Sequence, residues 1–251
     1  MLRFLIAQLD LKLLFGKLNV RGLKGALDKL PDNLEGVYEA LMERIFVQDV
    51  ERQAIAKAAL IWITYAKRRL NVHELLHAIA IHFDPKITCL DSEILIDVED
   101  LLSCCLGLVV VNREDEIIRL VHYTTQNYLE NAFDRVDKNT SIAKSCLAYL
   151  DLTLKFWPVS QEMNPKSEGF DSGWLSFSGR NLFAAEYKLA PYAATYWGKH
   201  AHDGTQEELT RDILDVLSHR QAVELLLEWN HWADHYGFTI LVRGGAVELW
   251  N

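Results

Sequence analysis

The sequence predicts a mainly helical protein with one small β-hairpin. Through most of the chain, apolar residues recur every three or four positions, which is the spacing of one face of an α-helix. Residues 108–121 depart from this spacing, because two short apolar runs there flank a polar turn, as in a β-hairpin. Half of the 251 residues are hydrophobic, which is enough to bury the cores of one large or two to three small domains.

The first 50 residues are expected to form a small helical unit. Leucines and one isoleucine recur at helical spacing over residues 2–13. A second helix is expected over residues 20–30, because Pro31 cannot continue it. Asn33 can cap a third helix, whose apolar face comprises Leu34, Val37, Tyr38, Leu41 and Ile45.

Three more helices are expected between residues 54 and 105. The helix at 54–66 is apolar almost all round, which places it at the centre of a core. Asn71 and Glu74 have the spacing of a capping box, and they start a helix that runs to about Phe83. Asp84-Pro85 ends this helix, and the third one is expected at 94–105.

A β-hairpin and a further helix follow. Residues 108–112 and 116–121 are expected to be the two strands, joined by the turn Arg113-Glu114-Asp115. Thr124 can cap a helix over residues 125–133. Three helices followed by a two-stranded hairpin wing are the layout of a winged-helix domain, which we expect over residues 52–135.

The rest of the chain is expected to be helical again. Its helical pieces are 141–157, 182–201 and 206–229, and an irregular loop rich in Pro, Gly and Ser lies at 160–173. Tryptophans are concentrated in this half. Most should pack between helices, and those near the end could form an exposed face for self-association or partner docking. They are Trp157, Trp174, Trp197, Trp229, Trp232 and Trp250.

Four segments resemble fungal NACHT proteins of the STAND class, which are NLR-like signalling ATPases that commonly carry C-terminal ankyrin repeats. The segments occur in the order and spacing of that family over residues 2–219. They are ALDKLPDNLEGVYEALMERI, LIWITYAKRRLNVHELLHAIA, DLLSCCLGLVVVNREDEIIRLVHYTTQNYLE and YAATYWGKHA.

The resemblance implies a domain order. Residues 1–51 correspond to the helical tail of a NACHT-type ATPase module, 52–135 to the winged-helix domain and 136–227 to a helical connector domain. Residues 228–251 would be a degenerate start of an ankyrin-like region or a disordered tail. The implied function is that of a non-catalytic regulatory module in non-self recognition and cell-death signalling. Its implied partners are proteins, such as a NACHT ATPase domain or ankyrin repeats.

The sequence departs from the family in its phosphate-binding motif. An ATP site of this kind needs GxxxxGK[ST], in which backbone amides and a lysine cradle the phosphates. The two Gly-Lys pairs here, Gly16-Lys17 and Gly198-Lys199, are followed by leucine and histidine and lack the upstream glycine. We therefore expect no ATP hydrolysis, no catalytic residue and no cofactor. Residues 239–244 likewise lack the Pro, His and Ala of the ankyrin signature TPLHxA.

The competing interpretation is a zinc-dependent hydrolase. His73, Glu74 and His77 spell HExxH (HELLH, 73–77), which on a helix places both imidazoles on one face with a Glu to activate water. A third ligand is required, and the candidates have no recognisable spacing: His82, Glu93 and Glu99. We expect a structural helix here rather than a metal site.

His122 is the candidate for nucleotide sensing. It lies between the second hairpin strand and the next helix, and Val121-His122-Tyr123 resembles the MHD position of NLR-type ATPases, where a winged-helix histidine senses the phosphates of bound ADP. An imidazole between a strand end and a helix N-terminus is also placed to meet an anion. The alternative is a packed, hydrogen-bonded histidine.

Charge and cysteine content indicate which partners and which cellular compartment are expected. Acidic residues outnumber basic ones 35 to 26, and residues 87–112 contain no basic residue, so we disfavour a winged-helix nucleic-acid binder and an anionic membrane surface. No apolar run reaches the roughly 20 residues of a membrane span. The four cysteines form no CxxC pair and no signal peptide is recognisable, which favours a cytoplasmic protein.

Overall fold

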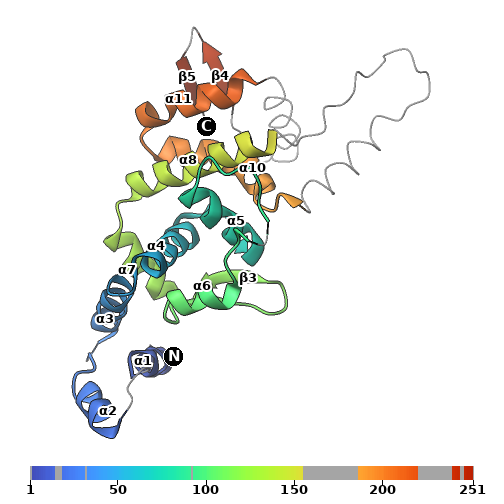
Figure 1. Ribbon diagram of the computed structural model, residues 1–251. Helices are drawn as coiled ribbons and strands as arrows, with labels where there is room; N and C mark the ends of the chain where they lie inside the picture. Colours follow the sequence, from blue (N-terminus) through green and yellow to red (C-terminus); the bar gives the residue numbers. More distant parts are fainter. Residues whose placement is uncertain are drawn as a thin grey trace. The chain divides into compact units, whose positions relative to one another are not determined.

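The computed structural model describes residues 2–14, 19–31, 33–91, 93–154, 186–219, 239–243 and 246–250, and they are mainly helical (Figure 1). The helices are α1 (Leu2–Leu14), α2 (Val20–Leu27), α3 (Leu34–Phe46), α4 (Val50–Tyr65), α5 (Val72–Phe83), α6 (Val98–Cys104), α7 (Tyr123–Ala132), α8 (Arg135–Leu154), α10 (Ala190–Asp203) and α11 (Gln206–Ser218). The strands are β1 (Leu70–Asn71), β2 (Val109–Val111), β3 (Ile117–Leu120), β4 (Thr239–Arg243) and β5 (Ala246–Trp250).

Two compact units divide the chain, and the first comprises Met1–Leu75 and Ile96–Asp134. Its core surrounds α4, whose Ala56, Ala59 and Leu60 are fully buried, in agreement with the expectation of a central helix that is apolar almost all round. Burying one such leucine contributes about 2 kcal/mol of transfer free energy. The hairpin wing lies beside this core, because Val109 and Ile118 turn their side chains inward.

The sheet of the first unit has three antiparallel strands in the order β1-β3-β2, one more than expected. Val109 pairs with Leu120, and the backbone N–H of Asn112 donates to the Ile117 carbonyl. The turn therefore includes Glu116 as well as the expected residues 113–115. Leu70 pairs with Ile118, and this extra pairing was missed because a strand of two residues carries no periodic signal. The consequence is that the segment before α5 is fixed against the wing.

The predicted helix at 94–105 begins later, at Val98. The Asp97 side chain accepts a hydrogen bond from the backbone N–H of Glu99 and so caps the helix there. Upstream, the Asp91 side chain accepts from the N–H of Glu93, which stabilises a turn instead of a helix. Short acidic side chains compete with helix formation in this way, and the apolar pattern of 94–96 does not reveal it.

The second unit comprises Leu76–Leu95 and Arg135–Asn251. Helix α8 packs along α10 and α11 (Figure 1). His200 joins two of these helices, because its Nε2 lies 2.8 Å from the Tyr192 hydroxyl and its Nδ1 lies 2.8 Å from Oδ1 of Asn139 on α8. Trp197 is buried, as expected of a tryptophan that packs between helices.

Several expectations fall outside the described residues. These are the loop at 160–173, the outer parts of the pieces 141–157, 182–201 and 206–229, and the side chains of the other five tryptophans. The described part of the C-terminal segment forms the antiparallel hairpin β4-β5, and its ankyrin-like interpretation stays a prediction. Within the described ranges, no helix combines the length and apolar character needed to cross a membrane.

Candidate functional site at the start of helix α7

A pocket of about 480 Å³ lies in the first unit, where the end of α4, the strands β1 and β3 and the start of α7 meet. It is lined by apolar side chains of the strands and by Arg68, Arg69, Arg119 and His122. No acidic side chain belongs to this lining. A basic pocket is therefore built into a chain whose formal net charge is -9.

His122 precedes the first residue of α7 and is the N-cap of this helix. The backbone N–H of Thr124 donates to Nδ1 of His122, so the cap residue is His122 and the prediction that Thr124 caps this helix was wrong. The prediction failed because threonine is a strongly preferred capping residue, whereas histidine is not. Sequence preference therefore placed the helix start two residues too late.

Capping fixes which ring nitrogen of His122 carries the proton. Nδ1 accepts a hydrogen bond, so in the neutral imidazole the proton is on Nε2. Nε2 makes no hydrogen bond within the described part of the chain. The side chain thus offers an N–H donor at the pocket while its other nitrogen holds the helix.

A chain of hydrogen-bonded hydroxyl groups orients the imidazole ring of His122. The Thr125 hydroxyl donates to the Tyr38 oxygen at 3.0 Å, which leaves the Tyr38 proton for Thr124 at 2.8 Å and the Thr124 proton for Nδ1 of His122 at 2.8 Å. The ring is therefore oriented by a relay that begins on α3. A ligand that moved His122 would disturb this relay.

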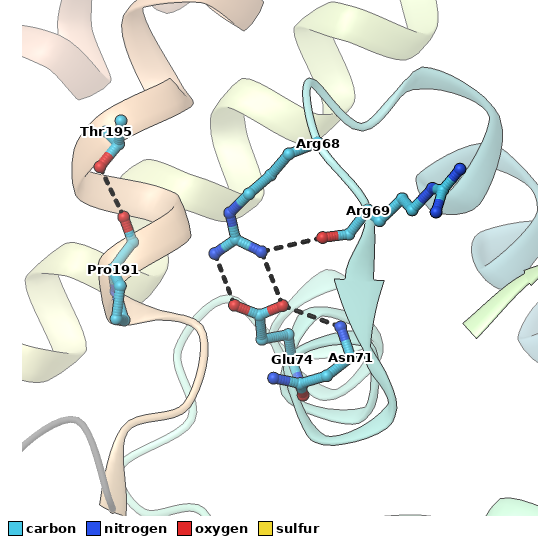
Figure 2. Close-up of polar contacts among 6 residues, drawn as sticks. All are labelled: Arg68, Arg69, Asn71, Glu74, Pro191 and Thr195. Carbon is cyan, nitrogen blue, oxygen red and sulfur yellow. Dashed lines mark hydrogen bonds and ion pairs between the residues drawn. The ribbon is translucent and has the colours of Figure 1, made fainter. Parts of the chain in front are cut away.

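The arginines of the pocket differ in their partners. Arg68 is held in a two-pronged ion pair, in which its two terminal nitrogens donate to the carboxylate oxygens of Glu74 at 2.9 and 2.6 Å (Figure 2). Arg69 and Arg119 form no ion pair with any described residue, and the Arg69 side chain points away from Glu74 in Figure 2. Sequence reasoning missed both arginines, since only the pairing of β1 with β3 brings them together.

One comparison with known proteins finds a match. Residues 42–143 match the family model described as "GPI inositol-deacylase, winged helix domain". The chain contains a winged-helix domain. The match encloses the expected boundaries of 52–135 and covers the three-stranded sheet, the pocket and His122. No curated protein and no solved structure matches the chain.

The HExxH residues point in different directions within this winged-helix region. Glu74 is engaged by Arg68 and also accepts from the backbone N–H of Asn71 at 2.9 Å. His77 is buried with its Nδ1 2.7 Å from the Tyr149 hydroxyl, whereas His73 is half-exposed and lies 3.8 Å from a carboxylate oxygen of Glu116.

These contacts give the three residues structural partners, and no group of three potential metal ligands occurs within the described residues. The predicted capping box is confirmed, because the N–H of Glu74 donates in return to Oδ1 of Asn71 at 2.8 Å. Nδ1 of His82 lies 3.4 Å from the Ser145 hydroxyl, and the side chains of Glu93 and Glu99 are exposed.

The third helix of the winged-helix domain, α6, is acidic on its exposed side. Glu99 and Asp100 occupy its first turn, and Asp97 caps it. A nucleic acid binder needs lysine or arginine at this place to contact phosphates. The arginines of the pocket lie instead just before β1 and on β3, so the acidic helix α6 gives no support to nucleic-acid binding.

Proposed function

We propose that this chain is a non-catalytic regulatory and protein-interaction module of a fungal NLR-like STAND signalling protein, which acts in the cytoplasm in non-self recognition and cell-death signalling. The observation that carries the proposal is the winged-helix match over residues 42–143, together with His122 at the start of α7. The resemblance of the flanking segments to NACHT proteins supports it. The matching description names a deacylase, but only a winged-helix part matches, so we propose no deacylase activity.

In this proposal the winged helix packs on a NACHT ATPase domain, and His122 reports whether a nucleotide is bound there. A phosphate near the pocket would accept a hydrogen bond from Nε2–H, while Nδ1 continues to cap α7. Loss of the phosphate would remove this hydrogen bond and leave the ring held only by its cap of α7 and by the Tyr38 relay. The helix start is therefore the element through which ligand binding would be transmitted.

The test is co-purification with a NACHT-type ATPase core in the presence of ADP. We expect the two proteins to elute as one complex, and His122→Ala to weaken it more than Arg113→Gln, an exposed wing residue outside the pocket. A chain that elutes alone with every such core would contradict the proposal. Ankyrin repeats supplied as a separate protein form the second arm of the same experiment.

The zinc-hydrolase alternative has its own test. Elemental analysis of protein purified without chelator separates the two functions, because a metal site requires stoichiometric zinc that is lost in His73→Ala. We expect substoichiometric zinc that the substitution does not change. His73 is half-exposed and forms a weak contact with Glu116, so this variant should stay folded.

A further inference from the structure

Two arginines of the winged-helix domain lie opposite each other on the exposed face of its sheet. Leu70 of β1 pairs with Ile118 of β3, so the antiparallel register places Arg69, the residue before β1, opposite Arg119. Leu70 and Ile118 are buried, and alternation sends the two arginines to the other face, where both are exposed. Residues directly opposite on antiparallel strands have Cβ atoms about 4.5–5.5 Å apart. Arg69 and Arg119, called here the arginine pair, therefore hold two cationic side chains close together.

No carboxylate within the described residues neutralises the arginine pair. Arg69 and Arg119 form no ion pair there, whereas the neighbouring Arg68 is neutralised by Glu74 (Figure 2). No acidic side chain lines the pocket to which all three arginines belong. Like charges directly opposite on neighbouring strands destabilise a sheet, so this pairing does not itself stabilise the fold. A negatively charged partner would turn the repulsion into attraction.

An exposed aromatic side chain lines the same pocket. Tyr123 is the first residue of α7 and is 66% exposed, and its ring centroid lies 4.3 Å from that of His122. Tyrosine and arginine are among the residue types that most often dominate the binding energy of protein interfaces. A small anion alone would gain little from exposed guanidinium groups, because water and salt screen the attraction. A protein segment adds apolar contact with the aromatic ring, so these features favour a protein.

Nucleic acid is a less suitable polyanion for this surface. Helix α6 of the same domain carries exposed Glu99 and Asp100 in its first turn and exposed Asp97 at its cap. A phosphate backbone that extends over the domain is repelled by such carboxylates. A short acidic segment of a protein can contact the arginine pair alone.

We propose that the arginine pair binds an acidic, extended segment of a partner protein, in which one carboxylate bridges Arg69 and Arg119. The two oxygens of a carboxylate offer about four lone-pair sites, which is enough to accept hydrogen bonds from both guanidinium groups. An apolar side chain next to this carboxylate lies against Tyr123. The proposal rests on the protein-interaction part of the proposed function and names the chemistry of the partner. It requires no nucleotide.

Fluorescence anisotropy of labelled peptides added to the full chain tests the proposal. The probe is a capped peptide of alternating glutamate and leucine, and the matched peptide has glutamine in place of glutamate. We expect saturable binding of the glutamate peptide alone, weakening as salt is added, and an affinity about tenfold or more lower for Arg69→Gln or Arg119→Gln. Both arginines are exposed, so the variants should fold, and relief of the repulsion should leave the urea midpoint unchanged or raise it.

Arg113→Gln is the matched control, since Arg113 is an exposed arginine of the same wing outside the pocket, and it should leave the affinity unchanged. Reversing both charges, with Arg69→Glu and Arg119→Glu in one chain, should transfer binding to a peptide with lysine in place of glutamate. Equal binding of the glutamate and glutamine peptides overturns the proposal. Binding that both single glutamine variants leave intact overturns it as well.

Other occupants of the surface are separated by two further measurements. A single-stranded oligonucleotide or pyrophosphate that binds more tightly than the glutamate peptide at about 0.15 M salt overturns the proposal in favour of a phosphate site. Self-association of the chain in sedimentation that Arg119→Gln abolishes also overturns it, because the occupant is then a second copy. No ATPase takes part in these measurements, so their outcome and that of the co-purification test are independent.

Discussion

At the scale of single residues, His122 has one role in the fold and a second, proposed role at the pocket. Its Nδ1 caps α7, and its Nε2–H is available to a ligand at the pocket. A variant that removes the whole ring removes both roles. An asparagine at the same place keeps one of them, because its side-chain oxygen can accept the bond from the N–H of Thr124.

We therefore predict that His122→Ala lowers the free energy of unfolding by about 1 kcal/mol, the usual cost of losing a cap, and that His122→Asn restores most of it. Urea unfolding followed by circular dichroism measures both. If the ADP-dependent complex with the ATPase core is lost in His122→Asn while stability returns, the ring contacts the ligand. Equal stability of the alanine variant and the unmodified chain would show that the cap contributes nothing.

Asp10 offers a prediction about pH. Its Oδ1 is buried without a hydrogen-bond partner in the described residues, and desolvation raises the pKa of its carboxyl group in the folded chain. A raised folded pKa means that ionisation costs more in the folded state, so Asp10 destabilises the fold above its folded pKa and not below its unfolded pKa. Asp10→Asn should raise stability at neutral pH, with a gain that shrinks as the pH falls toward 3.

Urea unfolding at neutral pH and at about pH 3, near the ordinary pKa of an aspartate, measures this dependence. The exposed Asp28→Asn is the control, and it should show no such gain. A gain from Asp10→Asn that stays constant across the pH range would contradict the assignment.

At the scale of elements, α5 is stabilised at its N-terminus by the reciprocal hydrogen bonds of the capping box, which the sequence predicts. Asn71 and Glu74 exchange side-chain to backbone hydrogen bonds at 2.8 and 2.9 Å, and Arg68 adds its two-pronged ion pair (Figure 2). The side chain of Glu74 is 7% exposed, so its charge is nearly buried and depends on these donors. The same glutamate would be the catalytic base in a zinc hydrolase.

We predict that Glu74→Gln lowers the free energy of unfolding by about 2 kcal/mol, because it weakens bonds to a charged partner, and that Asn71→Ala lowers it by about 1 kcal/mol. Thermal and urea unfolding of both variants provide the measurement. His73→Ala, on the exposed side of the same helix, is the control with little effect. Unchanged stability of Glu74→Gln would indicate that the carboxylate serves something other than the fold.

How far the elements could be predicted depends on what starts them. The capping box has a fixed spacing of residue types, so the start of α5 could be read from the sequence. The hairpin of β2 and β3 follows from two apolar runs around a polar turn, although its register does not. The start of α7 could not, because it rests on a histidine cap whose support comes from Tyr38 on a distant helix. The pocket shares this property, since Arg69 and Arg119 meet only through β1.

At the scale of the whole molecule, each of the two units contains a buried cysteine whose reactivity can be used to follow unfolding. Cys104 and Cys105 are buried in the first unit and Cys146 is buried in the second, whereas Cys89 is exposed. Burial raises the pKa of the Cys105 and Cys146 thiols, which removes the reactive thiolate as well as the access of a reagent. Thiol reactivity should therefore follow the folding of each unit separately.

We predict that iodoacetamide labels one thiol of the native chain, Cys89, and all four after denaturation. Partial desolvation and the neighbouring Asp91 raise the pKa of Cys89, so its labelling should be slow at neutral pH and accelerate only at higher pH than for a free cysteine.

Brief labelling at rising urea concentration, read by mass spectrometry, then shows whether Cys105 or Cys146 becomes reactive first. If both become reactive together, the units unfold cooperatively. Cys89→Ser is the control, and it should abolish labelling of the native chain. Two or more labels on the native chain would contradict the buried positions of the other cysteines.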